Sequence, residues 1–561
     1  MKTRVIQNEP EQPATNEDQV VLAEPRRPTN LAGRTLRWSG RHRMIAIVLL
    51  LAALVLAGAF LASRPGGSDA TAATGAPTAA PDFAAIDEFV EAEMDAQRVP
   101  GLALSIVEDD RIVHIRGFGK AGPSGRAVSP QTPFIIGSLS KSVTALAIMQ
   151  LVEAKKLDLD TPVQRYIPWF RVADEEASAQ ITLRHLLNQT SGLSTKTGRS
   201  FQGSGDTSDD ALERAVRKLS TVQLTKPVGA THQYSTINYS VLGLIVQTVS
   251  GQSYERYVQE HIFDPLKMGH SFTSEAEAKA QGLATGHHYW FGRPAAVDLP
   301  DNRGLIPAGY LVSSAEDMAH YLIAQLNDGR YGGAAVLSPS GTAELHRPAV
   351  PTSETDTSYG MGWFVGPVNG IPAVFHQGET FNYHANIVLM PGSDQGVVVL
   401  MNAENSLDLF IRGRMGTVAE GVASLLEGQE PPSPPSSTGI FVVYAALLGA
   451  IVLQVGGMIR SAAALRRRRV PTGRFGWKSR AGLALALNLA WALLVLVLLP
   501  KQFGVPLLTL AQGLPDLAYV LMVSGVVALA WGVLRTVWAY FAFRKGGAAG
   551  LTEPQALAQP L

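Results

Sequence analysis

The 561-residue sequence contains no cysteine, which excludes disulfides, thiolate metal ligands, a cysteine nucleophile and a lipid anchor on cysteine. It also lacks a net charge, since 47 lysines and arginines balance 47 aspartates and glutamates, so composition gives no support to nucleic-acid binding. The strings H-E-x-x-H, G-x-S-x-G and G-x-x-x-x-G-K-[ST] are absent. The histidines are scattered, with His287-His288 as the one adjacent pair, and they predict no metal site.

Four hydrophobic runs, uncharged except for Arg535 in the last one, are long enough to cross a bilayer, which takes about 20 helical residues. The first covers the 19 residues 44–62 and follows a leader with four arginines near its end. Small residues at the end of this run also fit a cleavable signal peptide, but a leader of 43 residues favours an uncleaved signal anchor. The other three runs cover 439–459, 481–500 and 517–541.

The charges between these runs predict how the chain crosses the membrane. The segment 460–480 carries eight arginines and lysines, whereas 502–516 carries none. Loops rich in lysine and arginine stay in the cytoplasm. We therefore expect a multi-pass protein of the inner (cytoplasmic) membrane, with both termini cytoplasmic and the central domain extracytoplasmic.

Composition divides the rest of the chain, because tracts rich in proline, glycine, serine and threonine are typical of linkers. The predicted parts are a disordered cytoplasmic tail at 1–43, a signal anchor at 44–62, a linker at 63–82, a globular domain at 83–428, a Pro-rich linker at 429–438, transmembrane helices at 439–459, 481–500 and 517–541, a basic cytoplasmic loop at 460–480 and a cytoplasmic tail at 542–561.

The domain at 83–428 is predicted to have an α+β fold. Apolar periodicity predicts a helix over 83–98, and strand patterns cover 102–107 and 112–118. After a region of helices and loops, strands are expected at 360–365, 373–376, 385–390 and 396–402. This order predicts an antiparallel sheet built from both ends of the domain, flanked by helices and joined to a helical subdomain.

The stretch Ser138-Leu139-Ser140-Lys141 places a hydroxyl and an amine three residues apart. It follows a strand-like run and begins an apolar-periodic segment, so both side chains are expected on one face of the first helical turn. An amine held there with little water can activate a serine hydroxyl as a nucleophile. The alternative is a helix cap at Ser138 and a solvated lysine at Lys141.

Two later stretches supply partners for this hydroxyl. Tyr234 precedes a predicted helix over 241–249, and its phenol is expected to have a pKa lowered by the Lys141 ammonium, which would make it a general base. The stretch His376-Gln377-Gly378-Glu379 ends an apolar strand, where a glycine permits close approach of a substrate. The alternatives are aromatic packing for Tyr234 and an ordinary strand end for His376.

In this order the three sets resemble the serine β-lactamase and penicillin-binding-protein superfamily, in particular its class C β-lactamase-like branch of peptidases, esterases and carboxypeptidases. The resemblance covers most of 85–425. Further landmarks occur in family order at 155–160, 166–168, 182–187, 190–193, 265–268 and 307–318. The S-x-x-K stretch is the only one in the chain.

The resemblance implies a role for each matching residue. Ser138 would be the nucleophile, Lys141 its proton partner and Tyr234 the general base. The oxyanion would be held by the backbone N–H groups of Ser138 and Glu379. The other residues expected at the substrate are His376, Gly378, Thr236 and Asn238.

Departures from the family pattern bear on which activity within the family is expected. Thr236 replaces the asparagine of Y-x-N, and Asn238 lies two positions too late to substitute for it. His376 stands where penicillin-interacting members carry the lysine of K-T-G, a variant that resembles the esterase and peptidase members. Gln189 replaces the histidine of H-T-S-G, and Lys267 the glycine of P-L-G-M; both changes are interpreted as structural.

The sequence thus predicts a membrane-anchored extracytoplasmic serine hydrolase that cleaves an amide or ester through an acyl-serine, with no cofactor and no metal. The expected partners are the lipid bilayer and a small peptide, a cell-wall-like peptide or an acylated small molecule, with no nucleic acid. One alternative is a β-lactamase or penicillin-binding protein. Another is a sensor of cell-wall peptides or β-lactams that does not turn over.

The three C-terminal spans also resemble the architecture of membrane-bound prodrug-activating D-peptidases, which remove an N-acyl-D-asparagine cap. Against that reading, Ile135 occupies the position where a polar specificity residue is expected.

Overall fold

The structure is a computed structural model that describes residues 81–354, 356–407, 414–433, 438–467, 476–503 and 506–544. The predicted tail at 1–43 and the predicted span at 44–62 lie outside these residues, as do most of the 63–82 linker and the tail at 542–561.

An eight-stranded antiparallel sheet organises the domain, in the order β2-β1-β14-β13-β12-β11-β10-β9. Its strands are β1 (Gly101–Glu108), β2 (Arg111–Gly119), β9 (Val350–Pro351), β10 (Ser358–Tyr359), β11 (Phe364–Val368), β12 (Ile371–Glu379), β13 (His384–Met390) and β14 (Gln395–Met401). The register of β1 on β14 runs from Leu102↔Met401 to Glu108↔Gln395. The sheet is therefore assembled from both ends of the domain, and the α+β prediction is confirmed.

Short strands form three smaller sheets, and helices occupy most of the chain between β3 and β9. The short strands are β3 (Phe134–Ile135) with β6 (Val312–Ser313), β4 (His287–Trp290) with β5 (Arg293–Ala296) and β15 (Ala403–Glu404), and β7 (Arg330–Tyr331) with β8 (Ala334–Ala335). The helices of the domain are α2 (Phe83–Gln97), α3 (Ser140–Glu153), α4 (Glu175–Gln180), α5 (Leu183–Leu187), α6 (Thr195–Ser200), α7 (Ala211–Arg217), α8 (Ile237–Ser250), α9 (Tyr254–Val258), α10 (Glu275–Ala280), α11 (Ala315–Leu326), α12 (Pro339–Leu345) and α14 (Thr417–Leu426).

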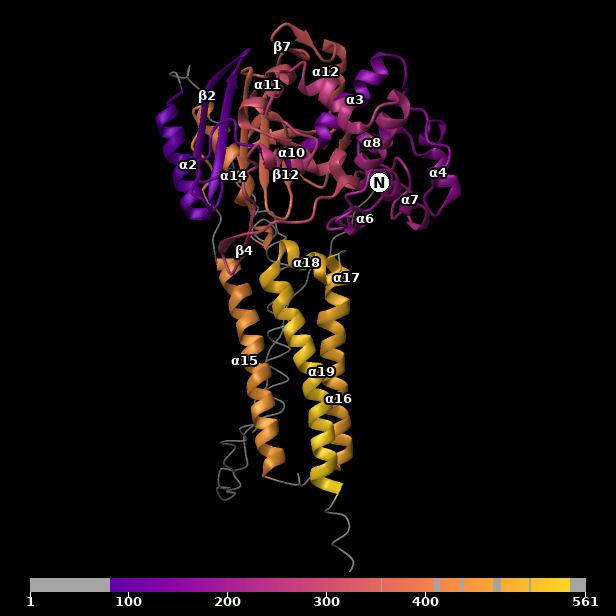
Figure 1. Cartoon of the computed structure of the whole chain (residues 1–561), viewed down its shortest axis with the longest axis vertical. Coiled ribbons are helices and arrows are strands. Elements are labelled where there is room, and N and C mark those ends of the chain that lie inside the picture. Colours follow the sequence, from indigo (N-terminus) through magenta and orange to yellow (C-terminus); the bar gives the residue numbers. More distant parts are fainter. Residues whose placement is uncertain are drawn as a thin grey trace, which may run out of the picture. The chain divides into compact units, whose positions relative to one another are not determined.

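The two faces of the sheet bury different side chains, because successive residues of a strand point to opposite faces. On β1, Leu102 and Leu104 pack with α2 and α14, whereas Ala103 belongs to the larger cluster on the other face. Helix α14 packs on β13, β14 and α2, whereas α11 packs on β1 and β14 from the opposite face (Figure 1). Helices α3 and α8 are buried almost all round, which is typical of helices that form the core of a domain.

The strand predicted at 360–365 is wrong in its position. The structure has a turn there, between β10 and β11, and Gly362 adopts φ +85°. A Cβ at Gly362 would lie 3.0 Å from the carbonyl oxygen of Lys141, so this turn packs directly on the start of α3. Period-two alternation cannot reveal such a turn, because it depends on a contact distant in sequence.

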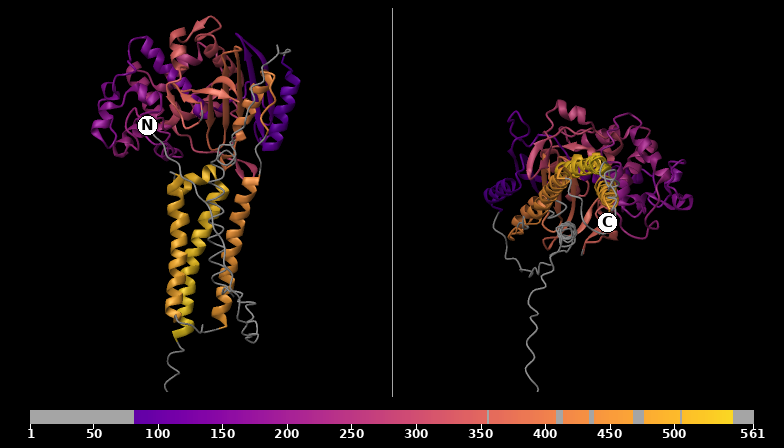
Figure 2. Two further views of the ribbon diagram at one scale, coloured as in Figure 1. Left: turned by 180° about the vertical axis from the view of Figure 1, so that it is seen from behind. Right: turned by 90° about the horizontal axis from the view of Figure 1, so that it is seen from below.

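The C-terminal part contains three helices that are long and apolar enough to cross a membrane, as predicted for 439–459, 481–500 and 517–541. The described residues contain these three such helices, and the fourth predicted span, 44–62, lies outside them. They are α15 (Thr438–Arg466), α16 (Trp477–Leu493) with its continuations η8 (Leu494–Leu498) and α17 (Leu499–Phe503), and α19 (Pro515–Arg544), which follows the short α18 (Leu507–Gly513). Figure 2 shows these helices running alongside one another. Residues 460–466, which include Arg460 and Arg466, continue α15, so the helix extends into the loop predicted at 460–480, since alanine, leucine and arginine are good helix formers.

A polar contact joins the three helices. The side chain of Gln454 on α15 and the indole N–H of Trp491 on α16 both bond to Ser524 on α19. The Gln454 Nε2 donates to the Ser524 carbonyl at 2.8 Å, and Trp491 Nε1 donates to Ser524 Oγ at 2.9 Å. In a membrane, apolar side chains contact lipid as favourably as they contact another helix. Interhelical hydrogen bonds of this kind therefore help to hold apolar helices together.

Candidate active site

Ser138 is held in a tight turn between β3 and α3. It lies in the 3₁₀ turn η1 (Gly137–Leu139), which directly precedes α3. The prediction that Ser138 belongs to the first turn of the α-helix is therefore wrong. Gly137 has φ +54°, and a Cβ there would lie 2.3 Å from the backbone nitrogen of Glu379. The side chain of Ser140 closes the turn by donating to the Gly137 carbonyl at 2.7 Å. Only glycine permits this entry from strand to helix.

Lys141 points at Ser138 from the first turn of α3. Its side chain is fully buried, and its Nζ lies 2.8 Å from Ser138 Oγ and 2.5 Å from the Ala308 carbonyl oxygen. Burial lowers the pKa of Lys141 from 10.5 to about 7, and the carboxylate of Glu379 opposes that shift. A lysine with this pKa exists substantially as the neutral amine near neutral pH, so it can accept a proton.

Tyr234 reaches the same hydroxyl from the segment before α8. Its phenol donates to Ser138 Oγ at 2.9 Å, and its ring lies 5.0 Å from Lys141 Nζ. The prediction of a lowered phenol pKa is wrong: desolvation raises the pKa of Tyr234 well above 10, and the bond to Ser138 only partly offsets this. The sequence indicated the neighbouring amine but not the burial that removes its charge.

Gly378 and Glu379, at the end of β12, pack against the turn that holds Ser138. A Cβ at Gly378 would lie 2.1 Å from the Ile136 carbonyl oxygen. The next pair along the hairpin is hydrogen-bonded, Thr380 N to Tyr383 O at 3.0 Å, so the Glu379–His384 pair is a non-hydrogen-bonded one. The N–H of Glu379 therefore points away from β13, toward the side where η1 lies, as an oxyanion donor must.

His376 lies on β12 close to the tyrosines rather than in solvent. It is buried, and its Nε2 lies 3.3 Å from the hydroxyl of Tyr359 while its Nδ1 lies 2.6 Å from the Gln377 carbonyl oxygen. Burial, assisted by Lys141, lowers the pKa of His376 to about 3, so the imidazole is neutral. This position thus carries no permanent cation.

Tyr359 is a residue of the site that sequence reasoning missed. Its ring contacts Tyr234 edge-on with centroids 6.2 Å apart, and it also packs on Phe364. The available signal was the alternation of large apolar residues and glycines in Tyr359-Gly360-Met361-Gly362-Trp363, a stretch too short to be assigned to the site on its own.

Asn238 departs from its predicted place at the substrate. It is fully buried, and its amide oxygen accepts from Ser191 Oγ at 2.7 Å while its Nδ2 donates to Gln189 Oε1 at 2.5 Å. The same Gln189 oxygen accepts the backbone N–H of Ser235 at 2.9 Å. Through these buried hydrogen bonds, Gln189 and Asn238 hold in place the backbone segment that carries Tyr234. Thr236 is half-buried in the turn that leads into α8.

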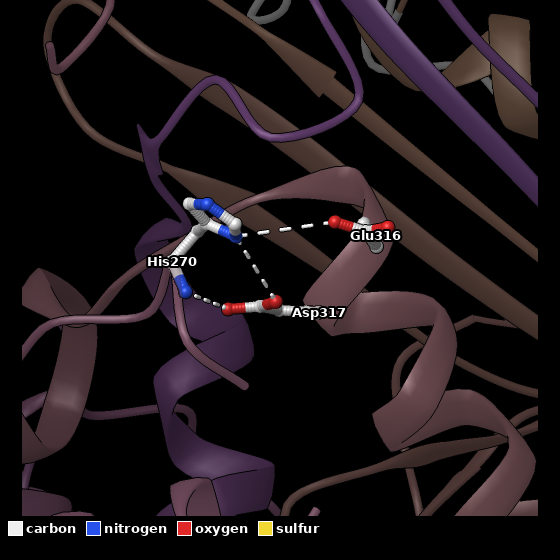
Figure 3. Close-up of side chains that lie close together, drawn as sticks. All are labelled: His270, Glu316 and Asp317. Carbon is white, nitrogen blue, oxygen red and sulfur yellow. Dashed lines mark hydrogen bonds and ion pairs between the residues drawn. The ribbon is translucent and has the colours of Figure 1, made fainter. Parts of the chain in front are cut away.

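One cluster of possible metal-binding side chains occurs among the described residues, formed by His270, Glu316 and Asp317 (Figure 3). The buried carboxylate of Asp317 already accepts the backbone N–H of His270 and the hydroxyl of Ser271, both at 2.7 Å. Asp317 also lies in the first turn of α11, where a negative charge is favourable. These bonds tie the loop to the helix, and we assign no metal to the cluster.

Comparison with known proteins gives the geometry a family context. The family model described as Beta-lactamase matches residues 86–417, which is more than half of the chain and includes every residue of the candidate active site described above. The chain belongs to the Beta-lactamase family. In this family it is similar to Protein flp of Staphylococcus aureus strain MW2, with 30% identity over 328 residues. It is similar also to Penicillin-binding protein 4 of Amycolatopsis lactamdurans, with 30% identity over 371 residues.

The coverage of these matches differs. The match with flp covers 56% of this chain and 62% of that protein, so the chain spans about three fifths of the length of flp. The match with Penicillin-binding protein 4 covers 63% of this chain and 94% of that one.

Solved structures agree with the Beta-lactamase fold. The octameric penicillin-binding protein homologue from Pyrococcus abyssi aligns with a TM-score of 0.54 at 26% identity, over 66% of this chain and 82% of that chain. A class C β-lactamase aligns with a TM-score of 0.51 at 20% identity, over 60% of this chain and 94% of that chain, and at that identity it supports the fold alone.

Proposed function

We propose that this chain is a membrane-anchored serine hydrolase that cleaves an amide or ester bond through an acyl-serine intermediate. The observation that carries the proposal is the position of Ser138 Oγ, within hydrogen-bond distance of both Lys141 Nζ at 2.8 Å and Tyr234 Oη at 2.9 Å. An amine and a phenol converging on one serine hydroxyl is the arrangement of an activated nucleophile.

The pKa values suggest how the proton moves. Neutral Lys141 takes the proton of Ser138 as Oγ attacks the carbonyl carbon, and the N–H groups of Ser138 and Glu379 hold the oxyanion. Tyr234 gives its phenolic proton to the leaving group and regains one from the Lys141 ammonium, which restores both groups. A water molecule then attacks the acyl-serine, releases the acid and returns the proton to Ser138.

The three apolar C-terminal helices support membrane anchoring. With the basic residues of 460–480 in the cytoplasm, the domain at 83–428 lies outside it, where peptides and acylated small molecules are its substrates. The neutral His376 supports a peptidase or esterase, because no cation at this position binds the carboxylate that penicillins carry.

The test uses a fluorophosphonate, which labels activated serines. The wild-type chain is expected to be labelled and Ser138→Ala not, with Ser220→Ala, at an exposed position, as the control. Labelling of Ser138→Ala at full intensity would refute the nucleophile.

The substrate class is then read from a panel of D-Ala-D-Ala peptides, N-acyl-D-Asn amides, nitrocefin and p-nitrophenyl esters. We expect amides or esters to be hydrolysed. The second candidate, a penicillin-binding protein or sensor, is favoured by the name of the Amycolatopsis relative. Acylation by nitrocefin without turnover, together with no hydrolysis of the other substrates, would establish that candidate instead.

A further inference from the structure

Glu379 carries a carboxylate on the residue whose backbone N–H faces the Ser138 turn. Its side chain is exposed to solvent, in contrast to the buried Gly378 before it. Its charge acts on both groups that contact Ser138 Oγ, since it raises the pKa of Lys141 and of Tyr234. The carboxylate is therefore close to where the scissile bond lies and open to a substrate.

A buried pair of side chains stands next to Glu379. His384 is its cross-strand neighbour, and in a non-hydrogen-bonded pair the two side chains lie on the same face about 5 Å apart at Cβ. The Nδ1 of His384 lies 2.9 Å from Glu404 Oε2, and both side chains are at most 1% exposed. The Nε2 of His384 is buried and, in the part of the chain that the structure describes, has no hydrogen-bond partner.

This group has more negative than positive charge. Burial lowers the pKa of His384 to about 4, so the imidazole adds no positive charge at neutral pH. Although part of the Glu379 side chain reaches solvent, its carboxylate is surrounded by protein groups, and this desolvation, together with the neighbouring Glu404, raises its pKa to about 7. Because the charge of Glu404 raises the pKa of Glu379, the two carboxyl groups repel each other, and a cation placed beside Glu379 would relieve this repulsion.

The cationic side chains near Glu379 do not occupy the position beside its carboxylate. Lys141 is committed to Ser138 and Ala308, and it is substantially neutral near pH 7. Arg199 on α6 is the other cation that acts on Glu379, but its side chain is exposed, and within the described residues no ion pair joins the two. The neutral His376 supplies no charge either.

We propose that Glu379, supported by His384 and Glu404, is a subsite for an ammonium group that the substrate carries close to its scissile carbonyl. The inference rests on the proposed function and deepens it, because it selects amides or esters with a free amino group over acylated or carboxylate-bearing ones. The backbone N–H of Glu379 binds the carbonyl oxygen while its side chain binds the ammonium, so one residue aligns both. A charged hydrogen bond of this kind changes kcat/KM at least about tenfold.

The test compares, with the full chain in detergent, substrates with and without a positive charge near the carbonyl. D-alanine p-nitroanilide and its N-acetyl derivative place or remove an ammonium on the acyl side. We expect the wild type to prefer a charged member at least about tenfold in kcat/KM. Glu379→Gln should reduce that ratio toward one, and Glu379→Asp should retain part of it. The ratio cancels any change in steps that both substrates share. Glu277→Gln, which removes an exposed carboxylate on α10, is the matched control and should keep the ratio.

A second measurement separates this inference from the function on which it rests. D-alaninamide should slow fluorophosphonate labelling of Ser138 more than N-acetyl-D-alaninamide does. Equal protection by the two amides, or a preference for a substrate bearing a carboxylate, would overturn the subsite and leave the hydrolase in place. Absence of labelling in the wild type would overturn the proposed function and the subsite with it.

Discussion

The Nζ of Lys141 donates to the carbonyl oxygen of Ala308 at 2.5 Å, in a region where both residues are buried. Ala308 belongs to the turn η6 (Ile306–Tyr310), which packs on α3 and α8. A neutral amine that donates one proton to this carbonyl still has its lone pair for Ser138 Oγ. The backbone of a distant segment therefore orients the base.

The pH dependence of the reaction should follow Lys141. Because its folded-state pKa is lowered to about 7 and its active form is the neutral amine, kcat/KM should rise as pH increases through about 7. Initial rates with a neutral p-nitrophenyl ester between about pH 5 and 9 measure this rise of kcat/KM with pH. A rate that falls over the same interval would contradict the role of the amine.

The pKa of Glu379 lies in the same range, so a mutation is needed to decide whether Lys141 or Glu379 causes the rise of kcat/KM with pH, referred to below as the limb. The Glu379 carboxylate raises the pKa of Lys141, and its removal in Glu379→Gln should shift the midpoint to lower pH. The measurement is the same pH profile on the variant. Loss of the limb in Glu379→Gln would assign it to Glu379 rather than to Lys141.

Tyr234→Phe should slow turnover by about 10²-fold or more, because it removes the proton donor to the leaving group but keeps the ring. Tyr321→Phe is the matched control, since its buried phenol donates to Ser142 Oγ at 3.1 Å and not to Ser138. Steady-state kcat is compared with thermal unfolding of each variant. Equal kcat for the wild type and Tyr234→Phe would remove the tyrosine from the reaction.

Gly378→Ala should displace β12 from the Ser138 turn, because the added Cβ would lie 2.1 Å from the Ile136 carbonyl oxygen. The Glu379 N–H would move with the strand, and loss of one oxyanion donor lowers kcat by about 10²–10³. Gly392→Ala is the control, because its added methyl group meets no atom within 4 Å. Circular dichroism checks that both variants fold; a folded Gly378→Ala with normal kcat would contradict this oxyanion site.

Asn238→Ala should destabilise the domain by about 1–3 kcal/mol, since Ser191 and Gln189 would each lose a buried partner. The midpoint of urea unfolding measures the change, and Gln223→Ala, at an exposed position, serves as the control. If Asn238 instead bound substrate, the variant would keep its stability and show a raised KM.

The local part of the fold could be predicted from sequence. The helix expected at 83–98 is α2, and the strands expected at 102–107 and 112–118 are β1 and β2, because amphipathic periodicity and the Asp109-Asp110 turn are signals within one element. The S-x-x-K spacing likewise placed Lys141 beside Ser138, since residues three apart share a helical face.

What sequence could not supply depends on burial and on contacts between distant segments. The pKa of Tyr234 was predicted in the wrong direction because desolvation outweighs the neighbouring amine. Asn238 has the right residue type for a substrate ligand, but Gln189 and Ser191, which the fold brings from another segment, engage it in the core. Tyr359 enters the site only because β10 pairs with β11.

The pairing of β1 with β14 also determines when the domain can be completed during synthesis. Leu102 meets Met401, about 300 residues later, so the β1–β2 hairpin waits for nearly the whole domain before its inner edge is covered. Until β14 arrives, that edge is an unpaired apolar strand able to pair with another chain. The interval between synthesis of β1 and of β14 is therefore when this protein most needs a chaperone, and a chain cut short before β14 would leave the edge open permanently.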